Sequence, residues 1–85
     1  MKQFTYTITD PLGIHARPAG AIATEAKKFT AEITVAKGEK TADARRLFAL
    51  MGLSAKAGDE LVVTCEGKDE TAAAEAMLAL LRANL

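Results

Sequence analysis

Residues 2–19 have the sequence KQFTYTITDPLGIHARPA, and this stretch sets the pattern for the rest of the chain. Its apolar residues Phe4, Tyr6 and Ile8 alternate with threonines, which predicts a strand over residues 2–9 with one face toward a core. The next four residues have Asp first, Pro second and Gly fourth, the order typical of a type I turn. The chain is therefore expected to bend sharply before it reaches its histidine.

A helix is predicted to begin directly after His15. From Ala16 to about Lys28, alanines and Ile22 recur at helical spacing, and the basic residues near the C-terminal end complement the helix dipole. Pro18 is compatible with this helix because the first N–H groups of any helix have no acceptor within it. The only histidine of the chain is thus expected at the N-terminal mouth of a helix.

The remaining chain alternates between strand and helix patterns. The predicted elements are a hairpin with strands near 33–35 and 40–43, a short helix over about 45–52, a strand over 60–66, and a last helix that Asp69 caps and that buries Ala74, Met77, Leu78, Leu81 and Leu85. The order β-α-β-β-α-β-α predicts an α+β fold with helices on one face of a small sheet. The threonine-rich face of that sheet is expected to face water.

Length and composition indicate one folded domain over residues 1–85. The chain is 49% hydrophobic and 26% charged, which is typical of a globular protein. Its 11 basic and 11 acidic residues leave no net positive charge for contacts with phosphates, so no nucleic-acid partner is expected. No apolar run is long enough to cross a bilayer and the N-terminus does not resemble a signal peptide, so we expect a cytoplasmic protein without membrane insertion.

Charge is nevertheless unevenly distributed along the chain. Residues 17–56 contain eight basic and four acidic side chains, whereas residues 59–75 contain six acidic and one basic. Two interpretations remain open at this point. The basic stretch is either ordinary solvated surface or a patch that steers an acidic protein partner toward a reactive residue.

The segment GIHARPA, residues 13–19, contains the clearest chemistry. The backbone N–H groups of Ala16 and Arg17, the positive end of the helix and the Arg17 guanidinium can converge on an anion beside His15. A neutral imidazole is a free nucleophile that can accept and release a phosphoryl group. An isolated His-x-Arg pair is more often ordinary surface, so the prediction of a phosphoryl carrier depends on this wider arrangement.

Other chemistries fit the sequence poorly. Cys65 lies on the apolar side of the predicted strand 60–66 and is expected to be buried and inert. One histidine and one cysteine cannot supply the usual ligands of a zinc site, so no metal is expected. Ser54 lies outside the Gly-x-Ser-x-Gly turn of hydrolases. An RNA-binding sheet would need aromatic residues on its open face, and Phe4 and Tyr6 lie on the other one.

The segment around His15 resembles the phosphorylation motif of HPr, the family of histidine-containing phosphocarriers of the bacterial phosphoenolpyruvate-dependent sugar phosphotransferase system. The resemblance extends along essentially the whole chain and includes Lys28-Phe29-Thr30, Ile33-Thr34-Val35 and Leu47-Phe48. It implies an open-faced β-sandwich, a four-stranded antiparallel sheet with three helices on one face. It also implies a carrier that is not itself an enzyme and needs no cofactor.

The resemblance assigns roles to particular residues. Enzyme I would phosphorylate His15 at Nδ1 with Arg17 assisting at the phosphate, and the group would pass to Enzyme IIA domains of sugar permeases, with the carrier acting as a monomer. The residues that the resemblance implies for partner docking are Gly20, Thr24, Lys27, Arg46, Leu47, Phe48 and Met51. From the sequence alone, Leu47, Phe48 and Met51 share one helical stripe, and simple core packing is the alternative interpretation of that stripe.

Two positions depart from the family pattern. Gly20 stands where the family more often has alanine or threonine, and Arg46 stands where many members carry a regulatory serine. The departure at Arg46 bears on regulation rather than on phosphoryl transfer. The alternative function is a regulatory, protein-binding module of the same fold that does not carry phosphate. Such relatives tend to lack the active histidine, which this chain has.

Overall fold

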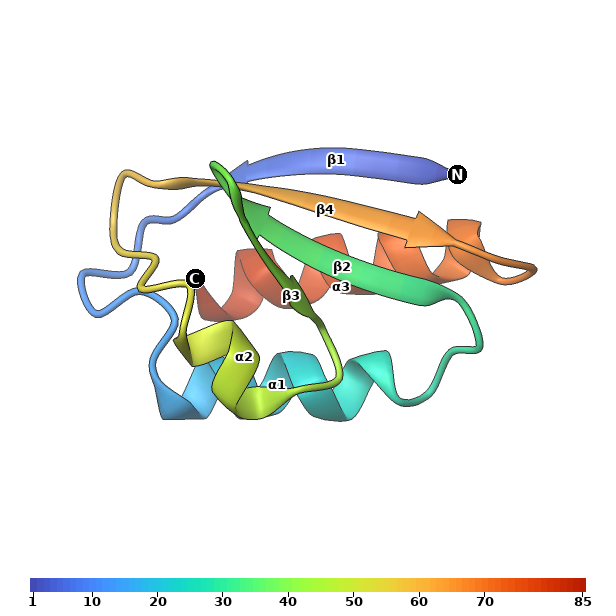
Figure 1. The fold of residues 1–85 in the computed structure, drawn as a ribbon, viewed down its shortest axis with the longest axis horizontal. Coiled ribbons are helices and arrows are strands. Elements are labelled where there is room, and N and C mark those ends of the chain that lie inside the picture. Colours follow the sequence, from blue (N-terminus) through green and yellow to red (C-terminus); the bar gives the residue numbers. More distant parts are fainter.

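Four strands and three helices follow one another in the predicted order in a computed structural model that describes all residues 1–85 (Figure 1). The elements are β1 (Lys2–Thr7), α1 (Ala16–Ala26), β2 (Glu32–Lys37), β3 (Lys40–Asp43), α2 (Leu47–Met51), β4 (Glu60–Glu66) and α3 (Glu70–Asn84). None of the helices combines the length and the apolar character needed to cross a membrane.

The strands form one antiparallel sheet in the order β1-β4-β2-β3. On its inner face, Val63 of β4 lies opposite Phe4 of β1 and Val35 of β2. On its outer face, Thr64 lies opposite Thr34. Because neighbouring residues of a strand point to opposite faces, this register keeps the apolar side chains on one side of the sheet and the threonines on the other. The predicted alternation is confirmed.

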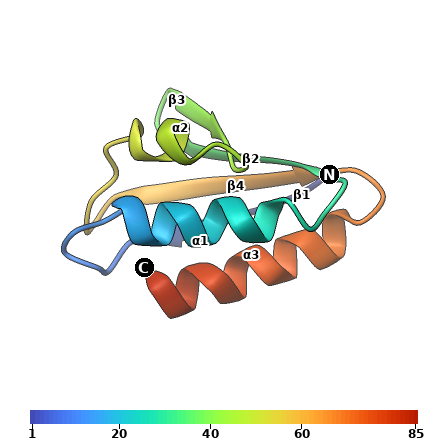
Figure 2. The same cartoon turned by 90° about the horizontal axis from the view of Figure 1, so that it is seen from below.

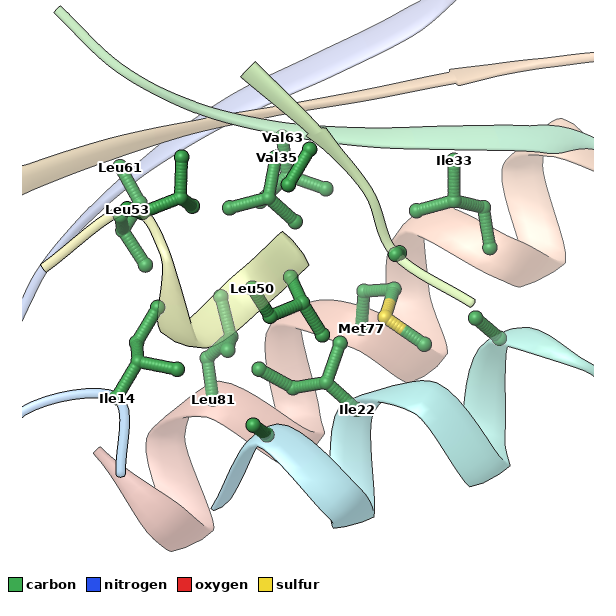
Figure 3. Close-up of a cluster of buried hydrophobic side chains, with 14 of the residues drawn as sticks. Ile14, Ile22, Ile33, Val35, Leu50, Leu53, Leu61, Val63, Met77 and Leu81 are labelled. Carbon is green, nitrogen blue, oxygen red and sulfur yellow. The ribbon is translucent and has the colours of Figure 1, made fainter. Parts of the chain in front are cut away.

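All three helices lie on the inner side of the sheet, and no element covers its outer side (Figure 1). The core lies between these two layers, where side chains from the sheet meet side chains from each helix (Figure 3). Its largest fully buried members include Ile22 of α1, Leu50 of α2 and Met77 of α3. The predicted open-faced β-sandwich, with four strands and three helices on one face, is therefore confirmed.

Three of the predicted elements are longer than the observed ones. Strand β1 ends at Thr7 rather than residue 9, because the N–H group of Thr9 turns away to donate to the carbonyl of Leu85 at 2.7 Å. Helix α1 ends at Ala26 rather than about Lys28, because the N–H group of Lys28 bonds to the carbonyl three residues back, as in a tightened last turn.

The short helix α2 begins at Leu47 rather than near residue 45. Asp43 ends β3 with a turn of its own, in which its carboxylate accepts the N–H group of Arg45 at 2.9 Å and its carbonyl accepts that of Arg46 at 3.0 Å. Arg46 therefore has extended backbone angles, with φ of −109° and ψ of 107°, and precedes the helix as its N-cap residue. An aspartate that bonds its own following backbone delays the start of the next helix.

The predicted burial of α3 was partly wrong. Met77, Leu81 and Leu85 are buried as expected, but the fully buried alanine of the first turns is Ala73, and Leu78 is only partly covered. Residues 73, 77 and 81 are spaced four apart and lie on one face of a helix. In the first half of α3, the buried position is therefore Ala73 rather than the predicted Ala74, a shift of one residue.

The side chain of Asp69 does not cap α3, contrary to the prediction. Its two carboxylate oxygens accept the backbone N–H groups of Thr30 at 2.9 Å and Ala31 at 2.8 Å, in the loop between α1 and β2. From the other direction, Nη2 of Arg45 donates to the carbonyls of Phe29 at 2.6 Å and Ala31 at 2.8 Å. The loop at 29–31 is therefore clamped by one anion and one cation from distant parts of the chain.

The hydrogen bonds of Asp69 make the stability of the fold depend on pH. Hydrogen bonds from the backbone of Thr30 and Ala31 hold the pKa of Asp69 below its ordinary value, because they favour the charged carboxylate. A carboxyl with a depressed pKa in the folded state stabilises the fold above the unfolded-state value of about 3.9. That contribution is lost as the pH falls from about 4 through the lower folded-state pKa.

We expect Asp69→Asn to lower the urea midpoint of unfolding near pH 7, because an amide offers one acceptor where the loop needs two. The variant should also lose less of its remaining stability than the wild type on acidification below about pH 4, since the titrating group is gone. Urea titrations across that range measure both effects. Glu75→Gln is the control, because Glu75 is exposed and has no hydrogen-bond or ion-pair partner. Identical acid slopes for Asp69→Asn and the wild type would contradict the assignment.

Candidate functional site

The loop before His15 is built around Asp10. The Asp10 carbonyl accepts the N–H group of Gly13 at 2.9 Å, which closes the predicted four-residue turn. The carboxylate of the same residue accepts the N–H group of Leu12 at 2.8 Å. Two hydrogen bonds to one residue hold a short loop in a single shape. The turn chemistry predicted from Asp-Pro-Leu-Gly is confirmed.

Gly13 is required at its position by both backbone angle and space. Its φ is +63°, a conformation that L side chains rarely adopt, and a Cβ atom there would lie 2.0 Å from the carbonyl oxygen of Ala55. The same oxygen accepts the N–H group of Ile14 at 3.0 Å, and the Ile14 side chain enters the core (Figure 3). The loop is thus fixed against residue 55 immediately before His15.

His15 is the N-cap residue of α1, as predicted. Its backbone is extended, and its carbonyl accepts the first helical hydrogen bond, from Ala19 at 3.0 Å. The N–H groups of Ala16 and Arg17 have no acceptor in the structure, and Pro18 has no N–H group. Two free donors at the positive end of an 11-residue helix therefore lie next to the histidine, which is the arrangement that binds anions.

The imidazole of His15 is half-buried, and its two nitrogens differ. Nε2 is buried and has no hydrogen-bond partner, whereas Nδ1 is not enclosed in this way. The side chain makes no cap hydrogen bond to its own helix. The ring is therefore held by no hydrogen bond within the protein, and Nδ1 is the less enclosed of its two nitrogens.

Cys65, the other nucleophilic side chain considered from the sequence, is fully buried on β4. Burial raises the pKa of its thiol, and the nearby carboxylates Glu70 and Asp69 raise it further, so the thiolate is disfavoured. The prediction that Cys65 is buried is confirmed.

Several cations on the surface of α1 and α2 have no carboxylate partner. Arg17, Lys27 and Arg46 are exposed and take part in no ion pair, whereas Lys28 pairs with Glu25 at 3.0 Å. The first turn of α1 also contains no acidic residue. Since α1 and α2 lie side by side (Figures 1 and 2), their surface carries positive charge that nothing within the chain neutralises.

Helix α2 divides its apolar residues between the core and water. Leu50, which the sequence analysis did not single out, is fully buried, while Phe48 is 81% exposed. Leu47 and Met51 are half-buried and pack against the core. Leu47, Phe48 and Met51 therefore do not form one common stripe as predicted. Leu47 and Met51 pack partly against the core, whereas Phe48 does not.

Gly20, Thr24 and Lys27 follow one another on one side of α1 at helical spacing. Thr24 and Lys27 are exposed and Gly20 is half-buried. A Cβ atom at Gly20 would meet nothing within 4 Å, so the packing of this chain does not require glycine there. The glycine instead leaves open space on the helix surface.

His15 does not line the one hollow in the molecular surface. That hollow, of about 460 Å³, lies over β2 and β3 and is bordered by Glu32, Thr34, Thr41, Asp43 and Arg45, together with Ile33 and Ala42. Small-molecule sites are usually concave and largely enclosed. A histidine on an open surface is instead accessible to another protein.

A histidine beside free backbone N–H groups, at the mouth of the first helix of an open-faced β-sandwich, fits the class of small phosphocarrier proteins. The family model described as the PTS HPr component phosphorylation site matches residues 2–83. The chain therefore belongs to the HPr family, the phosphocarriers of the phosphotransferase system, which act in sugar transport. The resemblance seen in the sequence is confirmed.

Individual relatives agree with this assignment. Phosphocarrier protein HPr of Lysinibacillus sphaericus is 42% identical over 81 residues, covering 95% of this chain and 92% of that protein. The structure of HPr-C-His from Thermoanaerobacter tengcongensis has a TM-score of 0.92 at 34% identity and covers 98% of this chain and 93% of that one. The fold is also similar to Crh, the catabolite repression protein of Bacillus subtilis, crystallised as a swapped dimer, with a TM-score of 0.78, 29% identity and coverage of 100% and 98%.

A matched pair of glycine substitutions tests how the loop before His15 is held. Gly38 has a φ of +59°, close to that of Gly13, but a Cβ atom there meets nothing within 4 Å. We expect Gly38→Ala to cost about 1–2 kcal/mol from the backbone angle alone. Gly13→Ala should cost clearly more, because the carbonyl of Ala55 must also move. Urea unfolding measures both free energies, and equal losses would show that the contact with Ala55 does not constrain the loop.

Proposed function

We propose that this protein accepts a phosphoryl group on His15 from phosphorylated Enzyme I and passes it to Enzyme IIA domains of sugar permeases. The observation that carries the proposal is the arrangement at the mouth of α1, where a half-buried imidazole lies beside two free backbone N–H groups and the unpaired Arg17. The family assignment supports the same role. We also propose that the chain acts as a single domain and a monomer in the cytoplasm.

The transfer needs a lone pair on Nδ1 of His15, so the ring proton resides on Nε2. Nδ1 attacks the phosphorus atom of the phosphoryl group on Enzyme I, a new N–P bond forms, and the bond from phosphorus to the donor breaks with its electron pair left on the donor. The same exchange in the opposite sense delivers the group to the Enzyme IIA domain. No net oxidation occurs, and no cofactor is needed at either step.

The chain's own residues stabilise the charge on the transferred group. Its three oxygens carry negative charge, and the N–H groups of Ala16 and Arg17 and the Arg17 guanidinium can each donate to them. The two backbone donors are fixed in place before transfer because they belong to a helix whose start is held by the loop at 10–14. Fixed donors need little reorganisation as the group moves, which suits a reversible carrier.

Partner docking is assigned to the surface of α1 and α2. The exposed cations Arg17, Lys27 and Arg46 favour an acidic partner surface, and the exposed ring of Phe48 supplies an apolar contact. Gly20 has no side chain and that of Thr24 is small, so a partner can approach the surface of α1 closely at these positions. Leu47 and Met51 contribute through their exposed halves.

A regulatory module that binds a protein without carrying phosphate is the second candidate, because Crh is similar to this chain along its full length. The presence of His15 with its anion-binding surroundings favours the carrier. A single phosphorylation experiment separates the two functions.

Incubation with Enzyme I, magnesium and phosphoenolpyruvate should add one phosphoryl group, detected as an intact-mass increase that is lost in acid. His15→Ala should remain unmodified. Arg17→Ala should fold normally but accept the group about tenfold or more slowly, since one donor to the charged oxygens is missing. Lys28→Ala is the matched control, because Lys28 is a cation already paired with Glu25. Undiminished labelling of His15→Ala, or no labelling of the wild type by active Enzyme I, would refute the carrier function.

Arg46 tests the electrostatic part of docking. The residue is exposed and unpaired, so Arg46→Glu should leave the fold intact and weaken binding of Enzyme I and Enzyme IIA several-fold at low salt. The effect should shrink as salt is raised, because exposed charges are screened. Calorimetric titration at two ionic strengths measures it.

Lys68→Glu is the control for Arg46→Glu, since it makes the same charge change in the turn after β4, at the opposite end of the molecule from the start of α1 (Figure 1). Equal affinities for Arg46→Glu and the wild type at low salt would remove Arg46 from the docking surface. Because Arg46 has no hydroxyl group, we also propose that the charge at this position cannot be switched by phosphorylation.

A further inference from the structure

Only three large hydrophobic side chains are strongly exposed, and two of them lie at the His15 end of the molecule. They are Phe48 at 81%, Met1 at 71% and Leu12 at 70% exposed. The loop that carries Leu12 and helix α2 with Phe48 both lie at the end of the molecule where α1 begins, whereas Met1 lies at the other end (Figures 1 and 2). Phe48 already has a proposed role, and Leu12 has none.

The exposure of Leu12 is built into the loop. Its N–H group is held by the Asp10 carboxylate at 2.8 Å, and the next residue, Gly13, is held by the Asp10 carbonyl at 2.9 Å. Gly13 itself lies against the backbone of Ala55 with no room for a side chain. The leucine therefore cannot fold back onto the core, and its side chain remains in water three residues before His15.

An exposed leucine gains free energy only when another surface covers it. Full burial of such a side chain is worth about 1.5–3 kcal/mol, which makes it an effective contact in a protein interface. Isolated exposed apolar residues are common and need no explanation. Here two of the three lie on segments at the end of the molecule where His15 begins α1, so one partner bound at His15 can cover both.

The charges around Leu12 indicate which surface covers it. Arg17 and Lys56 are both exposed without an ion-pair partner. Lys56 lies close to this loop, since a Cβ atom built at Gly13 would be 2.7 Å from its Cα atom. The carboxylate nearest to Leu12 in the chain is that of Asp10, and it accepts the N–H group of Leu12 at 2.8 Å. Leu12 is thus an apolar side chain in a loop where the unpaired cations Arg17 and Lys56 outnumber this one carboxylate, which complements an apolar pocket with an acidic rim.

We propose that Leu12 is a specificity-determining docking residue that enters an apolar pocket, rimmed by acidic side chains, on the protein that exchanges the phosphoryl group with His15. This inference rests on the proposed carrier function. Leu12 and Phe48 lie on two different segments at the same end of the molecule, so a partner bound there can make an apolar contact with each of them. Such contacts exclude water from the centre of an interface, and exclusion of water protects a phosphoryl group from hydrolysis during transfer.

The test is the steady-state rate of phosphoryl transfer from Enzyme I to the wild type, Leu12→Ser and Leu12→Met. Leu12→Ser should raise KM about tenfold with a smaller change in kcat, because the side chain touches the partner and not the reacting atoms. Leu12→Met keeps an apolar side chain of similar size and should restore the wild-type KM. Thr5→Ala, on the open face of the sheet, is the matched control for a change at an exposed residue.

The outcomes separate this inference from the proposed function. Phosphorylation of the wild type with the same KM for Leu12→Ser would overturn the role of Leu12 and leave the carrier function standing. No phosphorylation of the wild type would overturn both. Urea unfolding should give Leu12→Ser a stability within about 0.5 kcal/mol of the wild type, since the side chain is exposed. If sedimentation shows a wild-type dimer that Leu12→Ser abolishes, a second copy of the chain covers Leu12 and the proposal fails.

Discussion

The contact between the loop before His15 and the backbone of Ala55 is the constraint on which the site depends. The carbonyl of Ala55 takes the N–H group of Ile14 and leaves no space for a side chain at Gly13. Ile14 is then drawn into the core, so His15 must begin a helix at the surface. The two free N–H groups that can receive an anion follow from this geometry, because they belong to the first turn of that helix.

A second constraint sets the spacing of the helices that form the docking surface. The loop at 29–31 joins α1 to β2, and it is held by the Asp69 carboxylate at the start of α3 and by the Arg45 guanidinium just before α2. Backbone groups that a loop would otherwise expose to water are thereby paired with charged side chains. The far end of α1 and the start of α2 are consequently tied to the same three residues.

Helix α2 shows how a five-residue helix serves both packing and recognition. Leu50 anchors it in the core, and that anchor leaves Phe48 facing water, since residues two apart lie on different sides of a helix. Arg46 precedes the helix in an extended conformation, so its charge lies outside the helix rather than in its first turn. The exposed ring and the free cation therefore belong to one short segment that cannot move without losing Leu50 from the core.

The order of the elements, the α+β class and the place of His15 at the mouth of a helix could all be predicted from the sequence. These features depend on turn chemistry and on periods of two to four residues, which are local properties of the chain. The resemblance to the HPr family implied the four-stranded antiparallel sheet and proposed roles for the site residues, but not the strand order. It could not specify Leu12, because nothing in the sequence distinguishes an exposed leucine from a buried one.

Which distant groups contact one another depends on how the whole chain packs. Asp69 could satisfy either the N–H groups of its own helix or those of Thr30 and Ala31, and both choices are compatible with its place in the sequence. The same holds for Leu50 and Phe48, since a short apolar helix can bury either side. These choices follow from the packing of segments that are far apart in the chain, where a small rotation of a helix exchanges one buried residue for another, and local patterns carry no information about that rotation.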